Sequence, residues 1–357
     1  MNPAVSLEKI SPDALIVARA MALYWTWRPR SAHYNLVRQF TDKTASGATF
    51  TQEKVKLAQI ELTKAGLIVE HGHRQGFWRL ESGVRPLVYR RLLDAVPANA
   101  LKLALGQAEG NPYQQVYPGY RSFHGDNDSV LPYLCLELFS GAPVAELQAF
   151  RNRLSVYHDL NSMLYAACIE EFDADLFERI APEWRWDIAA SACARVCDSW
   201  SLRYLPCLEW ALEKLDSARN TVPLFVRRRL GMALLLRADK AKALAAVGEQ
   251  EGGAFDTVRA AILAQEGQWA QSQTAFERAI KSLQVELGRR KNLLTDGIGW
   301  LYPLVLLAQQ TPAHLALARK FCKAEAGPKS SSGGGWRIWE HVIAVRLGDE
   351  PINLSHF

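Results

Sequence analysis

Residues 51–70, TQEKVKLAQIELTKAGLIVE, decide the fold of the N-terminal part of the chain. Thr51 is a favourable capping residue for a helix start, and Gly66 is a favourable stop. Between them the apolar side chains recur at helical spacing, at Val55, Ala58, Leu62 and Ala65. Residues 67–70 then read as a short β-type run. We therefore predict a helix that leads directly into a strand.

The flanking residues extend this pattern in both directions. Ser11, followed by proline and aspartate, is a typical helix start, and an apolar helix is expected from there to Trp27. Ser31 is placed to cap a second helix that ends near Phe40. On the other side, a polar tip at 71–76 precedes a second β-type run. The prediction is three short helices followed by a hairpin.

This order is the layout of a winged helix-turn-helix, and residues 51–70 closely resemble the recognition-helix region of bacterial winged-helix repressors. In such domains the polar N-terminal end of the third helix can enter the major groove, and the hairpin tip can contact phosphates. We assign residues 1–95 to this domain. The predicted nucleic-acid-binding residues are Thr51, Gln52, Lys54, Lys56, Gln59 and Lys64 on the helix, and His73 and Arg74 at the hairpin tip.

The charge of the chain is concentrated in this N-terminal domain. Residues 1–95 contain 14 Lys and Arg against 8 Asp and Glu, a net charge of +6. From chain totals of 42 and 37, the other 28 basic and 29 acidic residues give −1. A basic surface favours contact with phosphates. Glu53 and Glu61 on the third helix oppose such contact, so docking on a protein is the alternative interpretation.

The composition is that of a folded protein without a membrane span. Hydrophobic residues make up 49% and charged residues 22% of the chain, and no apolar run is long enough to span a bilayer. The N-terminus lacks the layout of a signal peptide, and six cysteines are scattered singly. We expect a cytoplasmic location.

A linker or ordered loop is predicted at residues 96–130. Its second half is rich in glycine, proline, asparagine and tyrosine. Its aromatic side chains, interleaved with arginine and histidine, offer stacking surfaces for single-stranded bases, although such aromatics more often hold a loop on its own domain. These side chains are Tyr113, Tyr117, Tyr120 and Phe123.

Residues 131–357 show helical periodicity almost throughout. In the segment 260–283, Gly267, Phe276 and Ala279 occupy the relative positions of the glycine, aromatic and alanine residues of tetratricopeptide repeats, with Ser272 where alanine is usual. Residues 230–246 and 304–324 resemble the same helical hairpin. The predicted fold is therefore mainly α: a winged helix-turn-helix followed by a tetratricopeptide-like α-solenoid, with an irregular helical bundle as the alternative.

Two further segments, 276–326 and 132–154, are similar to the helical region upstream of the motor in large bacterial Swi/Snf-type helicases. The resemblance implies a non-catalytic module that engages duplex DNA without sequence preference and works with a helicase or ATPase motor. The chain itself lacks Walker A, DExH-type and arginine-finger motifs, so any ATP hydrolysis would take place downstream or in a partner.

The sequence contains few candidates for a metal site or a second basic surface. Cys193 and Cys197 lie one helical turn apart without a second ligand pair, and the basic clusters 227–229 and 289–291 are typical of solvated helix ends. We expect no enzyme activity, no cofactor and no metal. Two alternatives remain open: a protein-interaction scaffold without nucleic-acid contact, and a transcription regulator whose helical repeats sense a ligand or peptide.

Overall fold

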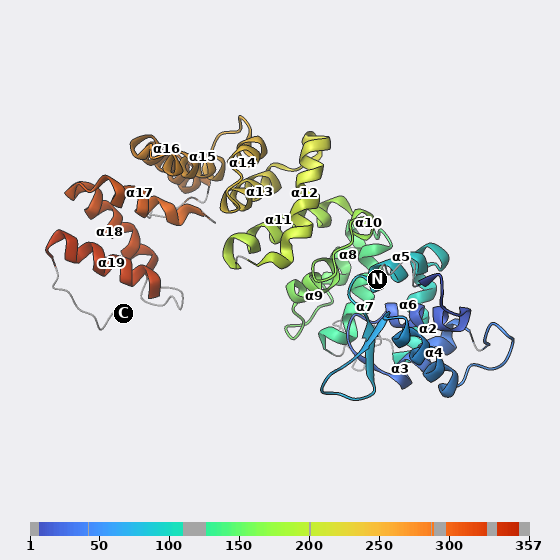
Figure 1. Cartoon of the computed structure of the whole chain (residues 1–357). Coiled ribbons are helices and arrows are strands. Elements are labelled where there is room, and N and C mark those ends of the chain that lie inside the picture. Colours follow the sequence, from blue (N-terminus) through green and yellow to red (C-terminus); the bar gives the residue numbers. More distant parts are fainter. Residues whose placement is uncertain are drawn as a thin grey trace. The chain divides into compact units, whose positions relative to one another are not determined.

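The structure is a computed structural model, which describes residues 7–41, 43–109, 126–199, 201–286, 288, 298–326 and 334–349. The chain divides into two compact units, Met1–Ile188 and Ala189–Phe357. In the described residues nearly all regular structure is helical, and the strands are confined to one three-stranded sheet in the first unit (Figure 1). The predicted mainly-α class is confirmed. No helix in these ranges has both the length and the apolar character needed to cross a bilayer.

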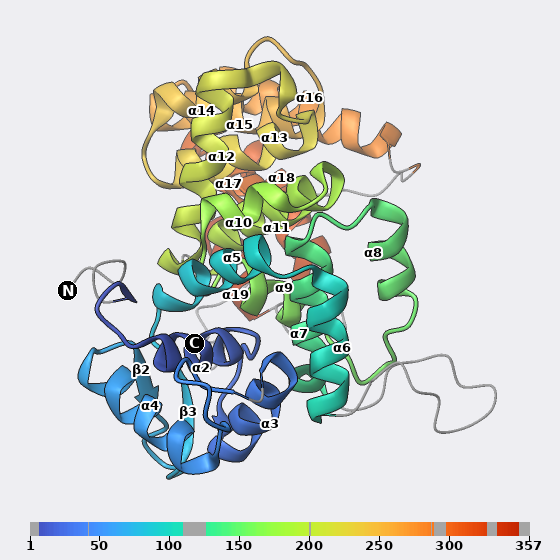
Figure 2. The same cartoon turned by 90° about the vertical axis from the view of Figure 1, so that its right-hand side faces the viewer.

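The first unit begins with three helices and a small antiparallel sheet (Figure 2). The elements follow in the order α2 (Pro12–Ala22), β1 (Arg28–Pro29), α3 (Arg30–Phe40), α4 (Gln52–Lys64), β2 (Ile68–Glu70) and β3 (Phe77–Leu80). β3 lies between the other two strands, with Arg28 opposite Trp78 and Ile68 opposite Leu80. The predicted three helices and hairpin are therefore present, and residues 28–29 add a third strand.

The predicted helix starts are correct at two of three places. The Ser11 side chain accepts from the backbone N–H of Ala14, and the Thr51 side chain accepts from that of Lys54. Ser31 is not a cap, because α3 already starts at Arg30. The residue before it, Pro29, pairs in the sheet and has the fixed φ that suits the start of a helix.

The predicted loop at 96–130 is wrong where it is described. Residues Ala98–Glu109 form α6, which follows α5 (Val84–Ala95) and packs against α3. Its buried residues Leu101, Ala104 and Leu105 lie on one helix face. The aromatic stretch at 110–125 lies outside the described residues, so its predicted stacking role stays a prediction.

The first compact unit also extends well past the predicted domain boundary at residue 95. It includes α7 (Asn127–Phe139), α8 (Val144–Arg151), α9 (Leu160–Cys168) and α10 (Ala174–Arg179). From Val130 to Phe139 every side chain of α7 is buried. A helix that is apolar all round belongs in the centre of a fold. α7 therefore serves as the core helix of the first unit, with α6, α8, α9 and α10 packed around it.

The second unit is built from helices that pack on their neighbours in sequence (Figure 1). After α11 (Pro182–Ser199), which crosses the unit boundary, come α12 (Leu205–Ala218), α13 (Leu224–Leu236), α14 (Lys240–Val247), α15 (Gly253–Gln265), α16 (Trp269–Glu286), α17 (Leu301–Gln309), α18 (Pro312–Ala326) and α19 (Gly334–Leu347). Close pairs form between α13 and α14, between α15 and α16, and between α17 and α18. The predicted helical hairpins at 230–246, 260–283 and 304–324 match these pairs.

The pair α15 and α16 explains the residues singled out in its sequence. Gly267 makes the turn between the helices with a φ of +75°, a conformation that favours glycine. Phe276 and Ala279 are fully buried. Ser272 is also fully buried, and its Oγ donates to the carbonyl of Ala260 on α15 at 2.7 Å. A serine is therefore accepted at this close helix contact because its hydroxyl has a partner.

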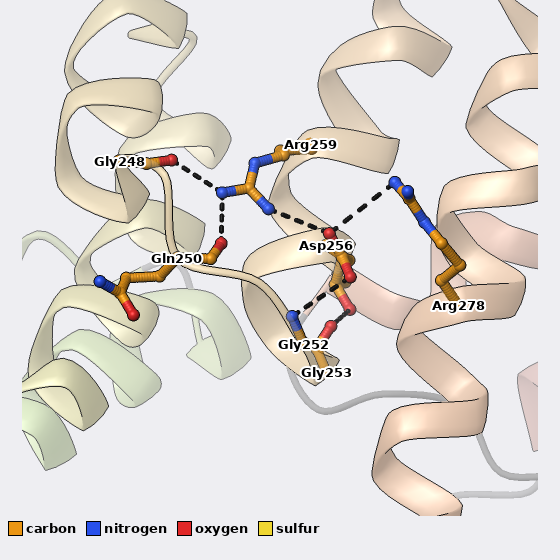
Figure 3. Close-up of polar contacts among 8 residues, drawn as sticks. Gly248, Gln250, Gly252, Gly253, Asp256, Arg259 and Arg278 are labelled. Atoms are coloured by element: carbon orange, nitrogen blue, oxygen red, sulfur yellow. Dashed lines mark hydrogen bonds and ion pairs between the residues drawn. The ribbon is translucent and has the colours of Figure 1, made fainter.

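A second polar contact joins the loop after α14 to α15 and α16 (Figure 3). The carboxylate of Asp256, which is 6% exposed, accepts from the Gly252 N–H and from Arg259 at 3.0 Å, and Arg278 of α16 lies 3.9 Å away. Arg259 also donates to the carbonyls of Gly248 and Gln250. The loop 248–252 is thereby fixed on the helix that follows it.

Removal of this carboxylate is expected to destabilise the second unit. Asp256→Ala should lower the free energy of unfolding by about 1.5–3 kcal/mol, because a half-buried Arg259 guanidinium and a backbone N–H lose their charged acceptor. Urea unfolding followed by circular dichroism measures the change. Glu213→Ala, which removes an exposed carboxylate from α12, is the matched control. Equal stability of the two variants would contradict this role.

Candidate nucleic-acid interface

The N-terminal end of α4 presents most of the residues predicted to contact nucleic acid. Thr51, Gln52 and Lys56 are exposed, and Lys54 is half-buried. Lys64 is exposed at the other end of the helix. Thr51 already accepts from the Lys54 N–H at 3.3 Å, so its hydroxyl has a structural role as the helix cap. Lys54 and Lys56 therefore supply the positive charge of this end.

Gln59 was predicted in the same set, and this prediction is wrong. Its side chain is 1% exposed and lies between α4 and α3. The Gln59 Oε1 accepts from Arg30 Nε at 2.7 Å, and its Nε2 lies 3.2 Å from His33 Nδ1. A buried amide with both ends bonded is unavailable to a ligand. Gln59 instead fixes the angle between the two helices.

The two acidic residues of α4 also have partners within the protein. Glu61 accepts from the backbone N–H of Ser11 at 2.6 Å and from its hydroxyl at 2.7 Å, which joins α4 to the start of α2. Glu53 forms an exposed ion pair with Lys56 at 3.5 Å. Glu53 therefore partly offsets the charge of Lys56, whereas the carboxylate of Glu61 is occupied by Ser11.

The hairpin tip at 71–76 is held by two side chains. His71 Nδ1 accepts from the N–H groups of His73 and Arg74, each at 3.1 Å. Glu70 Oε1 accepts from the Gly76 N–H at 2.6 Å. These bonds leave the side chains of His73 and Arg74 exposed at the tip. A fixed backbone with exposed basic side chains suits contact with phosphates.

A stacked group beside the hairpin was missed in the sequence. The Arg79 guanidinium lies over the Trp27 ring at 4.6 Å from the ring centroid, and His71 packs edge-on against that ring at 4.9 Å. Trp27 directly precedes β1, which places it across from Arg79 on β3. The pairing of residues 28–29 with β3 creates this contact, and a two-residue strand leaves almost no signal in a sequence.

The exposed side of α4 also carries two apolar residues that the sequence reading overlooked. Leu57 is 57% exposed and Ile60 is 43% exposed. They lie on the helix side opposite the buried Val55, Ala58 and Leu62. Their position was available from the helical period alone. Exposed apolar side chains next to Lys56 suit contact with thymine methyl groups or with a protein surface.

The cysteines and the basic cluster 227–229 noted in the sequence give no further site in the described part of the chain. Arg227 is buried and donates to the carbonyl of Ala246 at 2.9 Å, so it caps the C-terminal end of α14. Burial raises the pKa of Cys193 to about 12, which keeps the thiol protonated at neutral pH. No group of three metal-ligating side chains occurs in the described ranges. The basic cluster 289–291 lies outside them.

The chain was compared with models of protein families, with curated proteins and with solved structures, and none of these comparisons gave a match.

Proposed function

We propose that residues 12–80 form a winged helix-turn-helix that binds duplex DNA. The order of α2, β1, α3, α4, β2 and β3, with β3 in the middle of the sheet, supports this assignment. In this arrangement α4 is the recognition helix and the hairpin 68–80 is the wing. The bonds of Gln59 and Glu61 hold α4 on α3 and α2, so the helix is presented as a rigid element.

The observation that carries the proposal is the placement of the basic side chains. Three basic side chains reach solvent: Lys54 and Lys56 at the N-terminal end of α4, and Arg74 at the hairpin tip. Gln59, an uncharged residue in the middle of α4 that was also predicted to contact DNA, is buried. Phosphate contacts by lysine and arginine position a protein on DNA but do not read its sequence. We therefore propose binding to duplex DNA with little sequence preference.

The second unit is proposed to be a tetratricopeptide-like solenoid that docks on another protein. The successive helix pairs and the contact of Ser272 with Ala260 support this assignment. Together with the resemblance to the region upstream of Swi/Snf-type motors, it suggests a non-catalytic module of an ATP-dependent DNA helicase or translocase. The motor itself would lie in another part of that system.

Removal of the proposed phosphate contacts should weaken binding and its salt dependence together. For Lys54→Ala/Lys56→Ala/Arg74→Ala, the slope of log K against log salt should become less negative by about 2.7 if three phosphate contacts are lost. Fluorescence polarisation with a labelled duplex at several salt concentrations measures this slope. Lys281→Ala/Lys320→Ala/Lys323→Ala removes the same charge from exposed positions of the second unit. Identical slopes for both variants, or no binding by the unmodified protein, would contradict the proposal.

A second candidate function, a protein scaffold without DNA contact, is favoured by the exposed Leu57 and Ile60 on α4. Purification of the tagged protein from its native host with nuclease treatment separates the two. A stoichiometric partner that is lost in Leu57→Ser/Ile60→Ser, with no salt-sensitive DNA binding, would support the scaffold. DNA binding that is unchanged in that variant would count against it.

A further inference from the structure

The turn between α8 and α9 places two neighbouring apolar side chains in solvent. Val156 is 95% exposed and Tyr157 is 86% exposed, the highest values among the large apolar residues of the described ranges. Apolar surface is unfavourable in water, and a contiguous exposed patch of it usually marks a contact site. Tyrosine is also one of the residue types that are enriched among interface anchors. This turn therefore has the character of an anchor that inserts into another molecule.

The backbone of the turn is held in one conformation. The His158 N–H donates to the Ser155 carbonyl at 3.0 Å, and His158 Nδ1 accepts from the Ser155 N–H, also at 3.0 Å. The next residue, Asp159, donates its N–H to Asn127 Oδ1 at the start of α7. Because the backbone is already ordered, little conformational entropy is lost when the two side chains become buried in an interface.

A cavity of about 660 Å³ lies at the opposite end of α8 in the same unit. Its apolar lining includes Leu93, Phe139 and Ala142. The charged side chains of its lining are largely paired within the protein, Lys102 with Glu137 at 2.8 Å and Arg179 with Asp94 at 2.7 Å. Since these charges are already neutralised, the cavity suits an occupant that is mainly apolar and has one polar group. A tyrosine side chain has this character.

The helix between the turn and the cavity carries one charge near each of them. Glu146 lines the cavity and Arg151 ends α8 just before the turn, and both side chains are exposed. Neither forms an ion pair in the described part of the chain. Only Leu147 and Phe150 of α8 are buried, so one side of the helix is open along its length. Figure 2 shows α8 at an outer edge of the first unit.

The order of these features along α8 is self-complementary. We propose that two copies of this chain associate through α8, each inserting Val156 and Tyr157 into the cavity of the other. A two-fold interface requires that every contact is made twice, with the roles of the copies exchanged. If the two α8 helices are antiparallel, the turn after one helix reaches the cavity at the start of the other. Arg151 of each copy then meets Glu146 of the other.

Sedimentation equilibrium of the full chain without DNA, at concentrations up to about 200 µM, tests the association. A reversible equilibrium between monomer and dimer is expected. Val156→Ser/Tyr157→Ser should weaken dimerisation at least about tenfold. Leu202→Ser/Val285→Ser removes two exposed apolar side chains from the second unit and should associate as the unmodified protein does. Circular dichroism confirms that the variants are folded. A chain that stays monomeric, or a dissociation constant unchanged in the turn variant, would overturn the proposal.

Charge exchange along α8 tests the antiparallel pairing itself. Glu146→Arg alone places two arginines together at both contacts, and Arg151→Glu alone places two glutamates together. Each variant should therefore dimerise at least about tenfold more weakly than the unmodified protein. A mixture of the two variants has an opposite-charge pair at both contacts and should form the dimer again. Single variants that dimerise normally, or a mixture that stays monomeric, would overturn the proposed contact.

Discussion

Replacing Glu171 by alanine is expected to lower the free energy of unfolding by about 3–5 kcal/mol, the range seen when one partner of a buried ion pair is removed. Glu171 Oε1 and Arg85 Nη1 are 3.1 Å apart, and both side chains are only 3% exposed. Without Glu171, the guanidinium would remain charged in a site that excludes water. The loss is measured by urea or guanidinium unfolding at neutral pH.

The surroundings of this pair explain why the effect should be large. The Arg85 guanidinium lies 5.2 Å from the ring centroid of Trp25, and its Nε and Nη2 have no hydrogen-bond partner in the described residues. Burial lowers the pKa of Arg85 and raises the pKa of Glu171, which indicates that each charge depends on the other. The pair also joins α5 to the segment just before α10, so it holds distant parts of the first unit together.

Two variants separate the ion pair from ordinary packing. Arg85→Met/Glu171→Leu replaces both charges by apolar groups and should recover most of the stability that Glu171→Ala loses. Glu53→Ala breaks the exposed pair with Lys56 and should cost no more than about 0.5 kcal/mol. If Glu171→Ala costs as little as Glu53→Ala, water compensates the charge of Arg85, and Arg85 does not depend on Glu171.

The parts of the fold that depend on neighbouring residues were predictable from the sequence. Thr51 and Ser11 act as caps through bonds to residues three positions away, and Gly267 makes a turn through its own backbone conformation. The helix pairs of the second unit also follow from periods of a few residues. Each of these signals is complete within a short segment, so no knowledge of the tertiary structure is needed.

The features that were missed depend on contacts between distant residues. Gln59 has the same chemistry as Gln52. The helical period places it one turn from Val55 and Leu62, but only its hydrogen bonds to His33 and Arg30 on another helix explain why an amide is accepted there. The ion pair of Arg85 could not be predicted from the neighbouring residues, because its partner Glu171 is remote in sequence. The first compact unit extends past the predicted boundary at residue 95 for a related reason. Because α7 is buried on all sides, its sequence pattern does not indicate which helices surround it.

Acidification should destabilise the first unit through His33, which is the second large effect that we expect. His33 is 1% exposed, and burial, reinforced by the charges of Arg28 and Arg30, lowers its pKa to about 3. The hydrogen bonds around His33 also require a neutral ring. Because Gln59 Oε1 accepts from Arg30, the Gln59 amide N–H₂ faces His33 Nδ1, which must therefore be an unprotonated acceptor.

The sign of the effect follows from the two pKa values. Above pH 6.5 the histidine is neutral in both states and makes no difference. Between pH 6.5 and about 3 the unfolded chain binds a proton at this position and the folded protein does not. The free energy of unfolding should therefore fall as the pH falls, by about 1.4 kcal/mol per pH unit from this group alone.

A comparison of variants isolates this contribution from the carboxylates that titrate in the same range. His33→Asn keeps an acceptor for the Gln59 amide and removes the titratable ring, so its stability at neutral pH should be lower because of lost packing, while its dependence on pH should be shallower. The difference in slope between the two proteins, measured by urea unfolding from pH 7 to pH 4.5, should be about 1.4 kcal/mol per pH unit. Parallel curves would mean that His33 takes up its proton in the folded state. In that case the contact between α3 and α4 would have to open with acid, and the rigid presentation of α4 on which the proposed DNA contact depends would be lost first.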